Sequence, residues 1–343
     1  FFLIYSFIYI IPFLGILELS SGEYIISLVV SNMSGKSKIL NPTFLPKPNK
    51  ISVDGNEKIM DDDGEITVDS DRTTVLLSWN YGFNSFSLMF YGVTSIIIID
   101  LSSFTYRGRE EMIGTFSFCT NLISINFGNF DSSLVTDMFA LFQGDFNLPS
   151  LDLSKLDVSR VTDMRYLFDT SGISSVNLNN WNTSSLKYMY GMFASCYNLR
   201  TIDLSKFDTS NVEEMGGLFY NCSNLESIDL SNLDNSNLLD MNMMFTYCYN
   251  LKNVNLNGFN TRNVWNMSFI FYECKSLISI DISSFQTENV EDLDRFFFNC
   301  FKLKNINFGE FNTQNVLYIQ GMFFNCSSII SLDLSHITIP NAI

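Results

Sequence analysis

Seven cysteines occupy one position of a repeated pattern, three residues before the Leu or Ile that opens the next unit. We expect them to form a single row inside a stacked array, where neighbouring strands lie about 4.8 Å apart. That separation is near the range a disulfide tolerates, but side chains pointing the same way would have to swing together. We therefore expect buried, reduced thiols acting as small apolar residues. A straight row without histidine does not supply convergent metal ligands. The row comprises Cys119, Cys196, Cys222, Cys248, Cys274, Cys300 and Cys326.

A second row is polar and acidic, and it lies on strand residues expected to point away from the core. One reading is a binding face for cationic groups or a divalent metal. The other is a solvated strip with cross-strand hydrogen bonds that prevents aggregation. The residue pattern is compatible with both readings. The residues predicted to form the binding face are Asp152, Ser175, Asn177, Thr201, Asp203, Ser227, Asp229, Asn253, Asn255, Ser279, Asp281, Asn305 and Asn307.

The charge balance limits the partners. With 20 basic and 36 acidic residues the formal net charge is −16, so nucleic acid and anionic membrane surfaces would be repelled. We expect a protein or glycan ligand instead, and contact with a membrane only through an N-terminal signal or anchor. The oligomeric state stays open.

Catalysis has little support in the sequence. His336 is the only histidine, and there is no nucleophile elbow, phosphate-binding loop or zinc-ligand cluster. Paired carboxylates such as Glu110-Glu111 more often solvate a surface than act as an acid–base pair. Asp61-Asp62-Asp63-Gly64-Glu65 lacks the spacing of a calcium loop, so we interpret it as a solvated turn. We expect no enzyme activity, no cofactor and no metal.

Five Asn-x-Ser sequons could carry glycans if the chain is exported in a eukaryote. In an asparagine-rich chain several arise by chance. They begin at Asn32, Asn182, Asn221, Asn266 and Asn325.

The element that must position these rows is an internal repeat. The pattern Leu-x-x-Ile-Asp-Leu recurs every 26 residues, with one step of 25 between Leu148 and Ile173. Nine complete repeats cover 96–328, and a partial one covers 329–343. A single coil cannot bury its apolar residues, but stacked coils share one core. The 33 Phe and 14 Met residues largely fill fixed interior positions.

One repeat illustrates the expected local structure. Ile202 and Leu204 flank Asp203 with period two, which predicts a short half-buried strand. Apolar residues from Val212 to Cys222 then recur at steps of three and four, which predicts one short helix per coil. Asn211 with Glu214 resembles a capping box for that helix; Asn237 with Asp240 and Asn289 with Asp292 repeat it. The fold class is thus an α/β repeat solenoid with one strand and one helix in each coil.

This motif resembles the BspA-like leucine-rich-repeat surface proteins of bacteria and some single-celled eukaryotes. The resemblance rests on the string from Ile202 to Met215 and on Leu218-Phe219-Tyr220-Asn221-Cys222-Ser223-Asn224-Leu225. It covers roughly 84–343, and two coils depart from it by carrying Asp145 and Ser171 near the usual cysteine. The resemblance implies a curved solenoid at a cell surface, associated with adhesion and partner contact, and no catalytic centre.

The residues before the repeats differ in kind. Residues 1–17 are uncharged and apolar, which fits the core of a signal peptide or an anchor remnant; a buried strand or helix of a globular domain is the alternative. Short strand patterns in 18–83 predict a small β-rich cap. The repeat region is predicted to span 84–343.

Together these observations predict a secreted or surface-displayed, non-enzymatic protein that binds through its acidic face. A structural coat or spacer module is one alternative. An intracellular protein–protein interaction scaffold is another.

Overall fold

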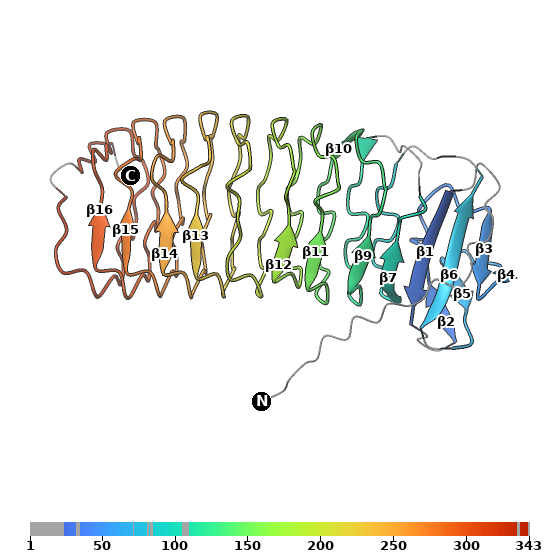
Figure 1. The fold of residues 1–343 in the computed structure, drawn as a ribbon. Coiled ribbons are helices and arrows are strands. Elements are labelled where there is room, and N and C mark those ends of the chain that lie inside the picture. Colours follow the sequence, from blue (N-terminus) through green and yellow to red (C-terminus); the bar gives the residue numbers. More distant parts are fainter. Residues whose placement is uncertain are drawn as a thin grey trace.

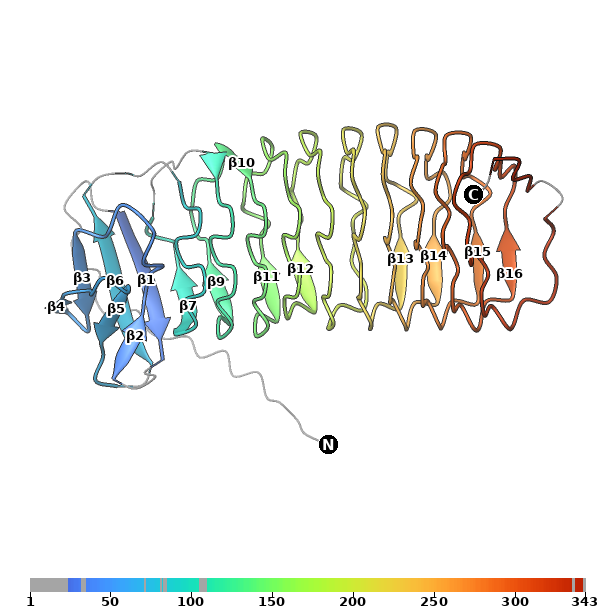
Figure 2. The same ribbon diagram turned by 180° about the vertical axis from the view of Figure 1, so that it is seen from behind.

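The computed structural model describes residues 24–31, 35–70, 72–80, 82, 85–104, 110–334 and 337–341. The chain forms coils that stand side by side in one row, with an N-terminal sheet at one end (Figure 1). The view from behind shows the same row, with the strands of successive coils aligned in one half of it (Figure 2). Among the described residues, the structure contains no helical segment with the length and apolar character of a membrane span. The predicted signal segment, residues 1–17, lies outside the described residues.

The N-terminal sheet is continuous with the first coils. Its strand order is β4-β3-β6-β1-β7-β9, in which β1 pairs antiparallel with β7 and β7 pairs parallel with β9. Trp79, Leu77 and Leu28 have no exposed surface and seal the start of the core. The strands of this region are β1 (Tyr24–Val30), β2 (Lys36–Lys38), β3 (Lys50–Val53), β4 (Asn56–Lys58), β5 (Glu65–Thr67), β6 (Thr73–Trp79), β7 (Ile96–Asp100) and β9 (Ser124–Asn126).

Further strands pair in parallel across coils, in the register that the repeat spacing predicts. Ser227 pairs with Asn253, 26 residues on, and Ser150 pairs with Ser175 across the one step of 25. Their central residues face the core and their outer residues face solvent, as the period-two pattern predicts. These strands are β11 (Ser150–Asp152), β12 (Ser175–Asn177), β13 (Ser227–Asp229), β14 (Asn253–Asn255), β15 (Ser279–Asp281) and β16 (Asn305–Asn307), while β8 (Glu110–Glu111) pairs with β10 (Val135–Asp137) on another side of the coil.

The prediction of one short helix per coil is wrong for the described residues. The segment from Met215 to Cys222 forms successive turns, so the solenoid is built from strands and turns. Every second N–H in it donates to the next coil: Met215 to the Asp240 carbonyl, Gly217 to Asn242, Phe219 to Met244 and Asn221 to Thr246, at 2.7–3.0 Å. The intervening N–H groups of Leu218, Tyr220 and Cys222 close turns to the residue three positions earlier.

The physical reason is that a helix would use these N–H groups inside its own segment. In a segment of about eight residues, helix nucleation is unfavourable and is followed by only a few intrahelical hydrogen bonds. Stacked coils instead provide a carbonyl of the neighbouring coil for the N–H groups. Two residues per coil take the left-handed conformation that alternating turns require, as Gly217 at φ 59° and Asn221 at φ 57° do. Apolar spacing of three and four fits such turns as well as it fits a helix.

The predicted capping boxes are wrong for the same reason. Asn211 does not cap a helix; its amide Nδ2 donates to the Ser184 carbonyl of the preceding coil at 2.8 Å. Asn237 and Asn289 make the equivalent bonds to Ser210 and Arg262. These asparagines therefore tie neighbouring coils together.

Phenylalanines form the centre of the core. Phe193, Phe219 and Phe245 stack on one another with centroids 5.7 Å apart and planes within 9°. The same stack continues through every neighbouring pair from Phe90 to Phe323. Aromatic contacts of this kind add to the burial of large rings, so the invariant Phe joins the coils along one axis.

The cysteines lie in one interior row as reduced thiols, as predicted. Six are buried and Cys326 is half-buried. The structure adds a role that composition did not suggest, because each S–H donates to a phenylalanine carbonyl of the preceding coil. Cys222 Sγ lies 3.0 Å from the Phe193 oxygen, and Cys248 Sγ lies 3.1 Å from that of Phe219. The other five make the same bond at 3.0–3.2 Å.

Thiol chemistry should therefore require opening of the array. Burial raises the pKa of Cys196 to about 12 and that of Cys326 to about 11, so little reactive thiolate forms at pH 8. We expect Cys326 to react first with a thiol reagent and the six buried cysteines to stay protected until denaturant is added. Peptide-resolved mass spectrometry measures both. Rapid labelling of all seven in the native protein, or fewer than seven thiols after unfolding, would contradict this.

Backbone strain gives a second prediction. Thr170 has φ 56° at the left-handed position where other coils carry Gly144, Asn221 or Asn299, and a β-branched residue is disfavoured there. Thr170→Asn should raise the free energy of unfolding by about 1 kcal/mol, measured by denaturant titration. Thr201→Asn is the matched control at an exposed position that does not take the left-handed conformation, with an expected change below about 0.5 kcal/mol. Equal changes in the free energy of unfolding for both substitutions would show that Thr170 is not strained.

Candidate binding face of the solenoid

The thirteen residues predicted for the binding face lie on the outer side of β11–β16 and of the segment 201–204, which aligns with these strands. Each is exposed or half-buried, and the apolar residue between each pair packs toward the core. Their location on one surface follows from the parallel strand register.

Each aspartate on the face closes a turn with one carboxylate oxygen. Asp203 Oδ1 accepts the Ser205 backbone N–H at 2.8 Å, and Asp229 Oδ1 accepts that of Ser231 at 2.9 Å. Hydrogen bonds from the serine two residues later, hydroxyl first and backbone second, lower the pKa of Asp152, Asp203, Asp229 and Asp281. These groups are therefore anions at neutral pH, with part of their hydrogen-bonding capacity used by the fold.

Asparagines relieve the repulsion between stacked carboxylates. The Asn177 amide donates to Asp152 at 2.9 Å, and the Asn307 amide donates to Asp281 at 3.1 Å. The strand pairs β7–β9, β11–β12, β13–β14 and β15–β16 all place Asp on the first strand and Asn on the second. The Asp-to-Asn order thus coincides with hydrogen-bonded pairing of the strands.

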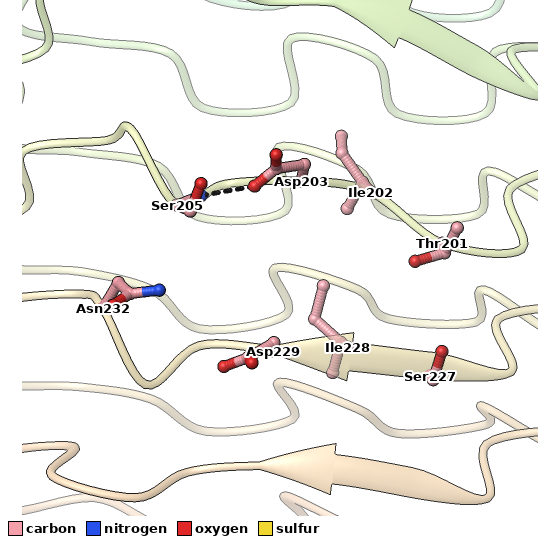
Figure 3. A pocket seen from close by; sticks show the side chains of 8 residues that line it. All are labelled: Thr201, Ile202, Asp203, Ser205, Ser227, Ile228, Asp229 and Asn232. Carbon is pink, nitrogen blue, oxygen red and sulfur yellow. Dashed lines mark hydrogen bonds between the residues drawn. The ribbon is translucent and has the colours of Figure 1, made fainter.

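One place on the face breaks this order. Asp203 is followed in the next coil by Asp229, and no asparagine lies between the two carboxylates. The segment 201–204 forms no strand ladder with β13, and a groove of about 330 Å³ opens there. Figure 3 shows the two carboxylates on adjacent coils of this groove, which is lined by Thr201, Ile202, Asp203, Ser205, Ser227, Ile228, Asp229 and Asn232.

Beside the groove runs a row of alternating charges. Glu226 accepts Arg200 Nη1 at 3.0 Å on one oxygen and Lys252 Nζ at 3.1 Å on the other. The cations on this flank are thus paired with Glu226. The positive charge of Lys206 adds to the lowering of the Asp203 pKa, whereas repulsion by the Asp229 carboxylate acts against it.

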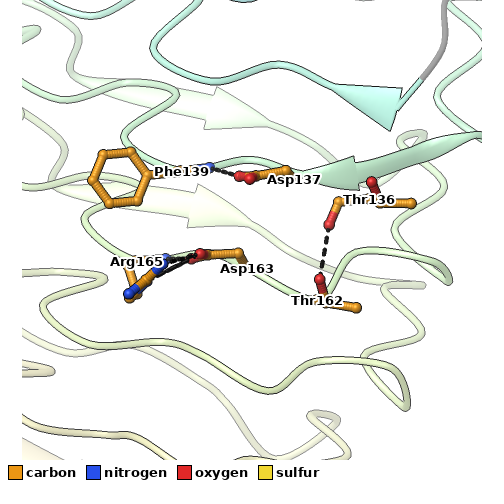
Figure 4. Close-up of polar contacts among 6 residues, drawn as sticks. All are labelled: Thr136, Asp137, Phe139, Thr162, Asp163 and Arg165. Atoms are coloured by element: carbon orange, nitrogen blue, oxygen red, sulfur yellow. Dashed lines mark hydrogen bonds and ion pairs between the residues drawn. The ribbon is translucent and has the colours of Figure 1, made fainter.

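Sequence reasoning missed a second acidic row on another side of the coil. Asp137, Asp163 and Asp240 lie on a ladder of parallel bridges that runs through successive coils. Figure 4 shows Asp163 held by Arg165, whose Nε lies 3.1 and 3.0 Å from the two carboxylate oxygens. Burial raises the pKa of Asp137 and of Asp240. The signal was present in the sequence, since an acidic residue directly precedes the interior Met in several coils.

The sequons differ in access. Asn32 lies outside the described residues. Asn266 is 8% exposed, and its side chain is hydrogen-bonded to Ser268 and Asp240. Its amide is therefore not accessible for glycosylation in the folded chain. Asn182 and Asn325 are exposed and Asn221 is half-buried, with its amide bonded to the Tyr197 hydroxyl.

The other acidic residues considered as metal ligands or binding groups have structural roles in turns. Asp61 Oδ1 accepts the N–H groups of Asp63 and Glu65, and its Oδ2 pairs with Lys36 at 2.9 Å, so this acidic run is a turn. The polar residues at the bends, such as Asp208 and Asp234, also close turns to the serine two residues later. Within the described ranges, no three His, Cys, Asp or Glu side chains are grouped as metal ligands are.

Comparison with solved structures finds repeat proteins at low similarity. A leucine-rich repeat protein from Bacteroides ovatus is 19% identical, with 76% of this chain and 83% of that chain covered and a TM-score of 0.23. One from Eubacterium ventriosum is 16% identical, with 70% and 85% covered and a TM-score of 0.26. The functional domain of InlJ from Listeria monocytogenes, which includes a cysteine ladder, is 14% identical, with 78% and 58% covered and a TM-score of 0.18.

No curated protein matches the chain significantly. One family model does, and it matches four overlapping segments, 84–199, 110–227, 145–256 and 214–337. These segments together span 84–337, well over half of the chain. The chain therefore belongs to the DUF285 family, described as a Mycoplasma protein of unknown function.

Proposed function

We propose that this chain is a non-enzymatic repeat scaffold that binds a basic segment of a protein partner through its acidic face, in adhesion at a cell surface. The observation that carries the proposal is the groove between Asp203 and Asp229. There two carboxylates face solvent on adjacent coils. In the paired strands, by contrast, the carboxylate of one coil accepts a hydrogen bond from an asparagine amide of the next coil. A Lys or Arg side chain from a partner would relieve their repulsion.

The rest of the face would support such a contact. Its exposed carboxylates repeat along one surface, and each is oriented by its turn to serine. A surface fixed in this way loses little conformational freedom on binding. Its negative field would draw a basic partner toward it and repel nucleic acid. Charge complementarity favours a basic protein segment over a neutral glycan.

The alternative function, a surface coat or spacer, also has an observation in its favour. The turn-closing role of each Asp on the face explains its presence without any ligand. Under that alternative, loss of a negative charge in the groove would leave partner contact unchanged. The two functions therefore make opposite predictions for the same substitutions.

Charge removal in the groove tests the binding function. Asp203→Asn with Asp229→Asn should weaken binding of a fluorescent oligolysine peptide about tenfold, the sum of two surface ion pairs. The turns should persist, because Asn177 and Asn255 close the same turn. Anisotropy titration measures the affinity, which should also fall with added salt.

The matched control is Asp208→Asn with Asp234→Asn. It removes the same charge from the same two coils, at exposed bend positions away from the groove. We expect this control to weaken peptide binding less than about twofold through the long-range field alone. Equal losses in the two double variants would overturn the groove as the contact and leave only a net-charge effect.

Location is tested separately. Brief protease treatment of intact cells should remove the protein if it is displayed at the surface. A cytosolic enzyme, followed as a marker of cell integrity, should stay intact. Because stacked, hydrogen-bonded coils resist cleavage, the digestion should be followed with antibodies against both ends of the chain. Full protection in intact cells with cleavage after lysis would favour the intracellular scaffold.

A further inference from the structure

Asp145 stands in the cysteine row. It follows Cys119 by 26 residues and precedes Ser171 by 26, and the thiols resume at Cys196. Its side chain has no exposed surface, although a carboxyl group is costly to bury. The interior row of thiols therefore contains one acid in the second complete coil.

The hydrogen bonds of this carboxyl group are incomplete. Its Oδ1 accepts the Cys119 backbone N–H at 2.9 Å. Its Oδ2 is buried and has no partner among the described residues. At the same place in other coils a thiol donates a proton to the preceding coil, as Cys222 does to Phe193. An ionised carboxylate offers two acceptors and no donor, whereas a neutral acid supplies one O–H.

Among the described residues, no cation compensates the charge that an ionised Asp145 would carry, because only its burial and the Cys119 N–H act on its pKa. The titratable group facing Asp145 from the preceding coil is the Cys119 thiol. Burial raises the pKa of this thiol well above its usual value, so it stays protonated and uncharged. From the next coil comes Ser171, which is uncharged, and the nearby Asp169 carboxylate is bound by the Gln143 amide at 2.8 Å. Burial raises the pKa of Asp145 well above its usual range.

We propose that Asp145 is a neutral carboxylic acid in the folded chain at neutral pH, taking the place of a thiol as the donor, and that its ionisation loosens the junction between its coil and the coil of Cys119. In this arrangement the O–H would donate to the Phe116 carbonyl, because the acceptor precedes six of the seven thiols by 29 residues. The acid is therefore a pH-sensitive element near the start of the array.

The direction of the pH effect follows from the raised folded-state pKa. The stabilisation is complete below the unfolded pKa of about 3.9. It is lost as the pH rises from there toward the folded pKa, because the unfolded chain releases this proton first. Alkaline pH should thus open this junction and expose Cys119, which is otherwise fully buried.

The test compares the wild-type chain with Asp145→Asn, which has the same shape and cannot ionise. A dipyridyl disulfide reagent labels thiols over a wide pH range, and mass spectrometry resolves each cysteine. We expect the ratio of Cys119 labelling rates, wild type to variant, to be lowest at about pH 4 and to rise from there by up to about tenfold per pH unit until the pH passes the folded pKa of Asp145. Taking the ratio at each pH cancels the reactivity of the thiol itself. Cys274, in a distant coil, is the internal control and should keep a ratio near one.

An infrared difference spectrum between the two proteins at pH 7 tests the protonation state directly. A protonated carboxyl band in the wild type supports the proposal, and its absence overturns the neutral acid. A Cys119 ratio that stays flat from pH 5 to pH 9 overturns the loosening. If Asp145→Asn fails to fold, Asp145→Cys restores the residue of the other coils and serves in the same two measurements.

Discussion

Backbone hydrogen bonds between coils are the constraint on which the other features of this structure depend. Alternate N–H groups of each coil, such as those of Gly217 and Phe219, donate to carbonyls of the next coil. A buried backbone group without a partner is costly, so the register between coils cannot slip. Once that register is fixed, residues 26 apart must lie side by side. The rows of Phe, Cys, Asn and Asp all follow from this, because each row is one repeat position extended along the array.

The same constraint decides what each row can do. Inside, the position that carries cysteine lies beside a phenylalanine carbonyl of the preceding coil, so a proton donor is favoured there. Outside, the position that carries Asp or Asn lies beside another of its kind, so amides and carboxylates alternate. Asp145 and Ser171 inside, and the Asp203–Asp229 step outside, are the departures from these local rules.

Periodicity could predict the coils, the short strands and the interior rows, since each depends only on which residues recur at which spacing. It could not distinguish a helix from successive turns between Met215 and Cys222. Both place apolar residues at steps of three and four, and they differ only in where the N–H groups donate. The left-handed residues gave a weak signal, because Gly217 and Asn221 share their positions with Met243 and Tyr247 in the next coil. The alignment of the coils in the sequence shows which Asp is followed by an Asn and which by another Asp. That a groove opens between Asp203 and Asp229 could be seen only from the strand register of the structure.

Because each coil contacts only its neighbours, a change in one coil acts over a short range. Neutralising Asp203 and Asp229 alters the fifth and sixth coils, whereas ionisation of Asp145 acts two coils or more away. The two effects should therefore add within about 0.5 kcal/mol when stability is measured. The nearest-neighbour organisation also means that the array need not unfold as a unit, so a loosened junction near Cys119 can coexist with an intact face at the groove. Long-range coupling between these places would require a second, differently stacked state of the whole array, and the continuous phenylalanine stack acts against one.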